Sequence, residues 1–382
     1  MDTPFVYDRF VTGKHFVGRK TECNALANLL TSKEHVAIYE PPKSGKMSII
    51  QQTLLNLRMA GKPFVVASLN MFNIRTVEDM LLKFAAAVVR PLSSTPDEYQ
   101  AIVDNYLEGT HFVFDRSRFN TDDEVVSLNW EVDSNDIEKM LMLPERIARQ
   151  RGVPYYVIVE DFQNIMMDDR YEDVFKVMEK IFTSCKGTDR NAVYLLTGSA
   201  VNAMKFIFEE KKYFYRMVVH LPLPEVEDSE VIEYVIKGFQ PSGKVISREL
   251  VMGACRLFRC QMWYINHFTY ICDSMTRGFL NEGILMDALK AMISIHEPRF
   301  HAIVNDLTGY QLSLVRAILD GVVKFSASEI IERYHLNSSA NVRRVKDALK
   351  KKEVITFNEK DEPLILDPLF EYWLINHYFQ IK

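Results

Sequence analysis

The stretch that decides the fold runs Tyr39-Glu40-Pro41-Pro42-Lys43-Ser44-Gly45-Lys46-Met47-Ser48-Ile49-Ile50, between a short apolar run and a segment of helical periodicity. It keeps the core of the phosphate-loop pattern G-x-x-x-x-G-K-[ST], in which backbone N–H groups at a helix N-terminus, a Lys and a hydroxyl bind phosphates and Mg²⁺. Gly45 and Lys46 fit this pattern, whereas Glu40 replaces its first Gly and Met47 its hydroxyl. The sequence therefore predicts a nucleotide site that lacks its usual Mg²⁺ ligand. The candidate binding residues of the loop are Pro42, Lys43, Ser44, Gly45, Lys46, Met47 and Ser48.

Composition narrows the class of protein only moderately. The 382 residues allow two or three domains, and 48% hydrophobic with 25% charged residues is ordinary for a globular chain. The net charge of −5 gives no global case for nucleic acid, so any such binding must come from a local patch. Five cysteines without C-x-x-C or His-rich spacing argue against zinc and against a disulfide framework. No stretch reaches the roughly 18 apolar residues of a membrane span, and we expect a cytoplasmic protein without a membrane partner.

Strand-like runs alternate with helical periods over residues 16–225, the pattern of an α/β fold with a parallel sheet and flanking crossover helices. We expect this P-loop NTPase core to span residues 1–224. Residues 93–140 are rich in Asp and Glu, which predicts a helical insertion with a solvated acidic face; a surface for a protein partner is the alternative. The expected core strands lie at 36–39, 64–69, 155–159, 193–197 and 217–221.

After Pro224 the pattern becomes helical, and we expect a helical lid over residues 225–300. Three further helices, near 309–320, 326–334 and 338–352, precede two short strands joined by a charged turn. Three helices and a hairpin predict a winged-helix domain over residues 301–382.

An acidic pair, Glu160-Asp161, ends the apolar run at 155–159. Phosphate-loop ATPases place carboxylates here to hold Mg²⁺ and to activate water, normally as Asp followed by Glu. The exchanged order makes Glu160 the candidate Mg²⁺ ligand and Asp161 the candidate base. Ser199 follows the next strand and could orient water, and Arg216 could approach a phosphate of its own or a neighbouring subunit. A strand-ending turn and a surface Arg are the alternatives for these two residues.

With these residues assembled, the chain resembles, nearly end to end, an AAA+/STAND-like family of ATP-binding proteins with a C-terminal winged helix, common in archaea and in Bacteroides-like bacteria. The matching segments are Phe16-Val17-Gly18-Arg19 with Glu22, the loop at 40–48, 143–148, 159–165, Thr197-Gly198-Ser199, Tyr215-Arg216, 338–342 and 367–374. The resemblance implies an adenine-side role for Val17, Gly18 and Arg19 and ATP or ADP as cofactor.

The departures from the family fall on the chemistry. The family carries Gly, a hydroxyl and Asp-Glu where this chain has Glu40, Met47 and Glu160-Asp161, and its His-Pro pair is absent at Gln261-Met262. Ser48 could replace the hydroxyl only if the loop shifted by one residue, which rotates it by about 100° on the helix. Weak or absent ATP hydrolysis is therefore the expectation, with Mg²⁺ binding doubtful at Met47.

The third helix of the winged-helix segment is basic on its outer face. Residues 343–352 contain six positive side chains and one negative, while Val342, Val345 and Leu349 form an apolar stripe. This arrangement suits a DNA-contacting helix, although a winged helix that contacts only protein is an equal alternative. The candidate DNA-contacting residues are Asn341, Arg343, Arg344, Lys346 and Lys350.

Three functions fit the sequence. The first is a nucleotide-dependent switch in which ATP or ADP sets the position of the winged helix toward a partner. The second is an active Mg²⁺-dependent ATPase, and the third is a pseudo-ATPase scaffold that binds DNA or protein without nucleotide. A homo-oligomer is left open, as is the biological process.

Overall fold

The computed structural model describes residues 5–120, 125–358 and 360–381. The chain divides into two compact units, one of residues 20–40 and 53–223, the other of residues 1–19, 41–52 and 224–382. In the described part of the chain, none of the helices combines the length and the apolar character that a membrane span requires.

The α/β unit is built on a five-stranded parallel sheet with the order β2-β5-β6-β1-β7. The strands are β1 (His35–Tyr39), β2 (Val65–Asn70), β5 (Tyr155–Glu160), β6 (Ala192–Gly198) and β7 (Val218–His220). β1, β6 and all of β5 except Glu160 are buried at every position, as expected of strands covered on both faces. Tyr39 pairs with Gly198 and Asn70 with Glu160, so these strands end at one edge of the sheet. The predicted α/β class and parallel sheet are confirmed.

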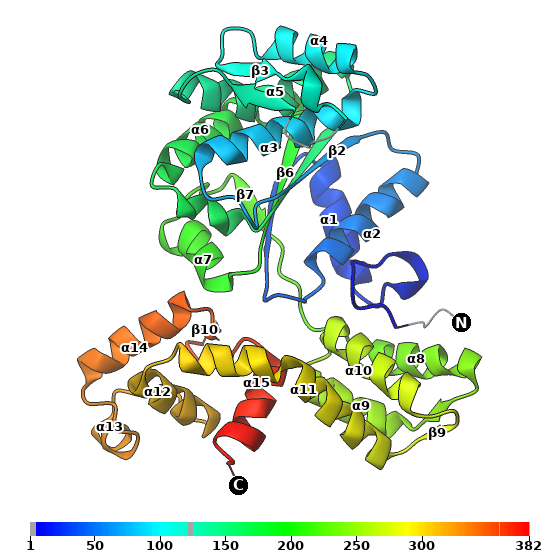
Figure 1. Cartoon of the computed structure of the whole chain (residues 1–382), viewed down its shortest axis with the longest axis vertical. Coiled ribbons are helices and arrows are strands. Elements are labelled where there is room, and N and C mark those ends of the chain that lie inside the picture. The colour runs from blue at the N-terminus through cyan, green and yellow to red at the C-terminus, as the bar shows by residue number, and fades with distance from the viewer. Residues whose placement is uncertain (1–4, 121–124, 359, 382) are drawn as a thin grey trace. The chain divides into compact units, whose positions relative to one another are not determined.

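Helices cover both faces of this sheet. One core cluster joins alternate strand residues, such as Val157 and Leu196, to apolar residues of α3 (Val77–Val89), α5 (Ser134–Arg151) and α6 (Tyr171–Ser184). α1 (Lys20–Thr31) lies on the other side of the sheet (Figure 1). α2 (Lys46–Met59) follows the phosphate loop, and the short helix α7 (Val201–Lys205) follows β6.

The insertion at 93–140 is not purely helical. It contains α4 (Pro96–Tyr106) and the start of α5, but also an antiparallel pair, β3 (Phe112–Phe114) and β4 (Val126–Leu128). Its acidic face is partly a capping network: Asp136 is fully buried and accepts hydrogen bonds from the His111 and Asp133 amides. Trp130, whose size favours a core position, is 71% exposed. Residues 121–124, which carry three of the acidic side chains, lie outside the described residues.

The second unit is largely helical around a core of its own. After Pro224 it contains the helices α8 (Asp228–Phe239), α9 (Arg248–Phe258), α10 (Met262–Met275) and α11 (Glu282–Asn305), with a small parallel pair β8 (Val245–Ile246) and β9 (Phe279–Leu280). Phe5 of the N-terminal segment lies in the same core, 1% exposed, against Phe239. A short 3-10 turn, Gly13–His15, also belongs to this segment.

The C-terminal part has the three helices and the hairpin that the sequence predicts. They are α12 (Gly309–Leu319), α13 (Ser328–Arg333), α14 (Ser339–Lys351) and the antiparallel strands β10 (Ile355–Phe357) and β11 (Pro363–Ile365). Val342, Val345 and Leu349 are buried, as the periodicity of α14 indicates. α15 (Pro368–Trp373) and one π-helical turn, Leu374–Tyr378, follow, and Trp373 and Leu374 join the core.

Two expected boundaries differ from the structure. Residues 1–19 and 41–52, expected in a core of 1–224, cluster with residues 224–382 instead. The boundary expected between residues 300 and 301 lies inside the continuous helix α11, which keeps its helical conformation past Pro298. Local changes in the sequence pattern therefore did not mark the boundaries of the compact units, because long-range contacts define these units.

Candidate functional site

The phosphate loop leads from the end of β1 at Tyr39 to the start of α2 at Lys46. Gly45 has φ of 90°, a left-handed conformation that favours glycine, and its carbonyl accepts the first helical hydrogen bond from the Ile49 N–H at 3.1 Å. The Lys46 side chain is only 8% exposed, and its ammonium donates to the Pro41 carbonyl at 3.0 Å and lies 3.5 Å from the Ser44 hydroxyl. The loop thus wraps its own Lys at a helix N-terminus, the arrangement that binds phosphate.

Arg19 holds the loop from the N-terminal side. Its guanidinium donates to the Ser44 carbonyl at 2.7 Å and to the Pro224 carbonyl at 3.3 Å. A Cβ on Gly45 would lie 3.3 Å from Arg19 Nη1, so this approach is tight for any residue larger than glycine. Arg19 therefore joins the loop to the segment that leads into α8.

Of Val17 and Gly18, both expected on the adenine side, Gly18 lies against the beginning of α8. Gly18 has φ of 66°, and a Cβ there would lie 2.6 Å from Glu230 Oε2 and 2.7 Å from Val226 Cγ1. Val17 is partly buried against the core of the helical unit. A side chain at position 18 would force Glu230 and Val226 to shift, so close packing accounts for this glycine.

Lys43 has aromatic partners that the sequence did not reveal. Its ammonium lies 3.6 Å from the centroid of the Trp263 ring and 4.9 Å from that of Tyr264, both on α10. Burial, followed by the charge of Arg299, lowers the pKa of Lys43 to about 8. No motif pairs a loop Lys with these aromatics, and only the three-dimensional contact identifies them.

A polar chain continues from Tyr264 to the winged-helix segment. The Tyr264 hydroxyl donates to Asp367 Oδ1 at 2.7 Å, and Arg299 of α11 forms an ion pair with the same carboxylate. Asp367 also caps α15 by accepting from the Leu369 and Phe370 amides. Burial acts to raise the pKa of Asp367, but the Arg299 charge and these hydrogen bonds hold it below its usual value. Lys43, Tyr264, Arg299 and Asp367 all line a cavity of about 110 Å³ between the loop and α15.

The loop fits phosphate better than Mg²⁺. The Met47 side chain offers no oxygen, and the Ser48 hydroxyl accepts a hydrogen bond from the Val11 N–H at 3.1 Å. The Glu40 carboxylate, at the position of the first glycine, accepts from the Leu223 N–H at 3.1 Å. The Ser48 hydroxyl therefore binds the N-terminal segment, and a thioether stands at the position of the usual metal-binding hydroxyl.

The acidic pair lies at the carboxyl edge of the sheet. Glu160 ends β5 and its Oε1 lies 3.4 Å from the Ser68 hydroxyl of β2. Asp161 adopts a left-handed conformation with φ of 51°, and its Oδ1 accepts from Gln163 Nε2 at 3.2 Å. The turn thus directs the two consecutive carboxylates differently, one toward β2 and the other toward its own 3-10 turn.

Ser199 and Arg216 are placed as follows. Ser199 comes directly after β6, on the edge where β1 and β5 also end, and is partly buried. Arg216 is exposed, with φ of 60°, and its guanidinium lies 5.1 Å from the ring centroid of Tyr215. Ser199 thus lies at the end of a core strand, where the sequence placed it. The contact described for Arg216 is with the adjacent residue Tyr215.

The basic face of α14 is partly occupied by local contacts. Asn341 Nδ2 donates to the Leu336 carbonyl at 3.0 Å, and Lys346 Nζ lies 4.2 Å from the ring centroid of Phe357 in the hairpin. Arg343 and Arg344 are exposed, and Lys350 is half-buried. Of the five candidates, the two arginines extend furthest into solvent.

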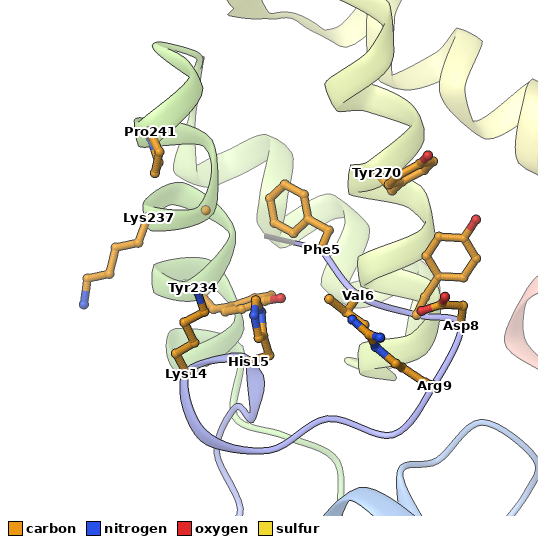
Figure 2. A pocket seen from close by; sticks show the side chains of 12 residues that line it. Phe5, Val6, Asp8, Arg9, Lys14, His15, Tyr234, Lys237, Pro241 and Tyr270 are labelled. Carbon is orange, nitrogen blue, oxygen red and sulfur yellow. The ribbon is translucent and has the colours of Figure 1, made fainter. Parts of the chain in front are cut away.

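A larger hollow of about 750 Å³ lies beside the N-terminal segment (Figure 2). It is lined by residues 5–9, 14 and 15, by α8 and the turn after it, and by Tyr270 of α10. The lining includes the rings of Tyr7, Tyr234 and Tyr270 and three cationic side chains, Arg9, Lys14 and Lys237. The loop residues 41–48 do not line it. The sequence did not predict this hollow, because its walls come from distant segments that carry no motif.

Comparison with solved structures shows the fold. A Walker-type ATPase of Pyrococcus abyssi aligns over 97% of this chain and 99% of its own, at TM-score 0.67 and 13% identity. The ADP form of the Aeropyrum pernix ORC2 protein aligns over 99% and 96%, at TM-score 0.55 and 14% identity. Its ADPNP–ADP complexes align over 97% and 96%, at TM-score 0.53 and 14% identity.

A family model described as "Probable winged helix domain" matches residues 298–376. A comparison with curated protein sequences gave no match. The fold is therefore that of a P-loop ATPase α/β core followed by a helical region with a winged-helix domain, as the resemblance in sequence led us to expect. At 13–14% identity the solved structures establish this architecture and no activity.

Proposed function

We propose that this protein binds ATP or ADP at its phosphate loop and works as a nucleotide-dependent switch with weak or absent hydrolysis. The observation that carries the proposal is the contact of Lys43 with Trp263 and Tyr264, and the hydrogen bond from Tyr264 to Asp367. A residue of the phosphate loop is thereby connected, through α10, to the cap of α15 in the winged-helix segment.

Phosphate binding follows from the loop itself. The N-terminus of α2 presents backbone N–H groups, and Lys46 supplies a buried cation. Anionic phosphates compete with the Pro41 carbonyl and the Ser44 hydroxyl, two neutral groups that contact Lys46. Val17, Gly18 and Arg19 would bound the site on the adenine side, with Arg19 fixing the loop through the Ser44 carbonyl.

Weak hydrolysis follows from the residues that would bind Mg²⁺ and activate the attacking water. The Met47 side chain has no oxygen, and the Ser48 hydroxyl accepts a hydrogen bond from the Val11 N–H. Glu160 is one methylene longer than the usual metal-binding Asp, and Asp161 one shorter than the usual Glu, and a misplacement of about 1 Å can cost on the order of 10²-fold in rate. We assign Glu160 to Mg²⁺, Asp161 and Ser199 to water, and Arg216 to a phosphate of the same or a neighbouring subunit.

The switch works through competition for Lys43. A cation over a Trp ring is stabilised by about 0.5–2 kcal/mol, which corresponds to a factor of roughly 2–30 in an equilibrium. Phosphate charge near the loop attracts the Lys43 ammonium and weakens its contact with α10. The change reaches α15 through the hydrogen bond from Tyr264 to Asp367, the residue that caps this helix. ATP and ADP differ in charge, so they shift this equilibrium to different extents.

Thermal unfolding of the full chain tests nucleotide binding. A ligand at 100 times its Kd should add about 2.7 kcal/mol to the free energy of unfolding. ATP and ADP should each stabilise the protein with or without Mg²⁺, Lys46→Ala should lose most of this effect, and Lys62→Ala, an exposed control, should keep it. Absence of stabilisation under every condition would refute the proposal in favour of a scaffold without nucleotide. Mg²⁺-dependent phosphate release that disappears in Lys46→Ala would instead establish an active ATPase.

A second candidate function is DNA binding by α14, favoured by the exposure of Arg343 and Arg344 above a buried stripe. Fluorescence anisotropy with duplex DNA at several salt concentrations gives the slope of log K against log salt concentration. The magnitude of this slope should fall by about 2 when both arginines become Ala, since each phosphate contact contributes roughly 1. Lys324→Ala, an exposed cation elsewhere in the winged-helix segment, should leave the slope unchanged. Binding that ignores both changes would favour a protein partner for this helix, or for the acidic insertion.

A further inference from the structure

Three potential metal ligands meet where α8 begins and α9 ends. The Cys260 thiol donates to Asp228 Oδ1 at 2.9 Å, and the two sulfurs of Cys255 and Cys260 and an Asp228 oxygen all lie within 4.8 Å of one another. Both thiols are buried, at 1% and 2% exposure, while Asp228 is exposed. The spacing of the cysteines in sequence gave no hint of this cluster, because the third ligand comes from another helix.

The end of α9 fixes the two sulfurs side by side. The Cys260 N–H donates to the Cys255 carbonyl at 3.0 Å, and Arg259 between Phe258 and Cys260 is left-handed with φ of 49°. This is the Schellman arrangement, in which the side chains three residues before and just after the helix end contact each other. Cysteines occupy both of these positions, so the helix terminus itself holds a dithiol.

We propose that Asp228, Cys255 and Cys260 form a binding site for a borderline-soft divalent cation, with Zn²⁺ as the best-fitting ion and water as fourth ligand. Tetrahedral Zn²⁺ with Zn–S of about 2.3 Å and Zn–O of about 2.0 Å places its ligand atoms roughly 3.5–3.8 Å apart. The sulfurs and the carboxylate lie in this range after a side-chain adjustment of less than about 1 Å. Binding releases the two thiol protons to solvent, and exposed Asp228 leaves a path for the ion.

The neighbouring charge does not oppose the ion. Arg259 turns toward the winged-helix segment, where it donates to the Ile365 carbonyl at 2.8 Å and pairs with Glu371. A second cluster of possible ligands, formed by His111, Asp133 and Asp136, is already explained by hydrogen bonds within the protein. Its carboxylates are used by the capping box of α5 and by His111, which explains that cluster without an ion.

Cobalt spectroscopy of the reduced full-length protein tests the site. With a non-thiol reductant present, one equivalent of Co²⁺ should produce a sulfur-to-cobalt charge-transfer band in the near ultraviolet, and Zn²⁺ should abolish it. Cys255→Ser or Cys260→Ser should halve the band, and Asp228→Asn should weaken Co²⁺ affinity by at least about tenfold, the lower bound typical of perturbed metal sites. Cys185→Ser, which removes a buried thiol of the other unit, should change nothing.

Two results would overturn the inference. One is the absence of a thiolate band in the folded wild type, or a band of undiminished intensity in Cys260→Ser. The other is a mass 2 Da lower in protein purified without reductant, together with no metal uptake after reduction, which would assign the pair to a disulfide. Should the Ser variants fail to fold, competition of wild-type protein with a chromophoric chelator for Zn²⁺ decides in their place: a 1:1 stoichiometry supports the site and no competition refutes it.

Discussion

Lys43 of the phosphate loop lies with its ammonium 3.6 Å from the centroid of the Trp263 ring on α10. The loop therefore belongs to the same compact unit as the helices that follow Pro224, although the strand before it belongs to the α/β sheet. Any ligand that changes the position of Lys43 changes a contact of the helical unit. This relationship gives the proposed switch its physical basis.

Replacing the ring that holds Lys43 should change nucleotide affinity. We expect Trp263→Leu to raise the affinity for ATP by a factor of about 2–30, because the competing cation–π contact of roughly 0.5–2 kcal/mol is lost. Calorimetric titration measures this change. Trp130→Leu, at an exposed position of the other unit, serves as the control and should have no effect. Unchanged affinity in Trp263→Leu would show that Lys43 does not compete.

The depressed pKa of Lys43, about 8 against an ordinary 10.5, predicts a pH dependence of stability. Between these values the unfolded chain holds the proton and the folded protein has released it, so the contribution of Lys43 to the free energy of unfolding rises with pH. Denaturant unfolding from pH 7 to pH 10 should show a steeper rise in wild type than in Lys43→Met. Parallel profiles for the two proteins would contradict the assigned burial of this cation.

His296 should make the helical unit sensitive to acid. Burial, and then the charges of Lys43 and Arg299, lower its pKa to about 4 from 6.5. Because the unfolded chain takes up this proton first, stability should decline as pH falls from 6.5 to 4, and less so in His296→Gln. Thermal midpoints across this range measure the difference. An equal decline in both proteins would assign the acid sensitivity to other groups.

Gly18 and Gly13 form a matched pair for testing the close approach to α8. Both have positive φ, 66° and 62°, but a Cβ on Gly18 would lie 2.6 Å from Glu230 Oε2, whereas nothing lies within 4 Å of one on Gly13. Gly13→Ala should cost about 1 kcal/mol from its backbone alone, and Gly18→Ala about 1–3 kcal/mol more from overpacking. Urea unfolding of both variants measures the difference, and equal losses would mean that α8 shifts at no cost.

Restoring the missing hydroxyl should restore the metal. In Met47→Thr we expect nucleotide affinity to become more dependent on Mg²⁺, because the new oxygen occupies the position that binds this ion in phosphate loops. Titrations of ATP with Mg²⁺ or with EDTA compare the variant with wild type. Gln51→Thr, at a partly buried position of the same helix, controls for the substitution. The same Mg²⁺ dependence in Met47→Thr and wild type would mean that the metal is held elsewhere.

The sequence by itself determined the order of the elements. Buried strands such as β5 and the amphipathic helix α14 can be predicted from sequence, because neighbouring residues in the chain set their periodicity. The loop between β1 and α2, the acidic pair at the end of β5 and the winged-helix segment were all identified from such local patterns. The β3–β4 pair was missed because its strands are only three residues long and carry little periodicity.

Tertiary structure alone decided which parts of the chain belong together. The ring that holds Lys43, the amide that occupies Ser48 and the carboxylate beside Cys260 all come from segments remote in sequence. Such contacts depend on the packing of whole helices, which carries no signature in the adjoining residues. For that reason the sequence located the phosphate loop, and only the fold connected it to the winged-helix segment.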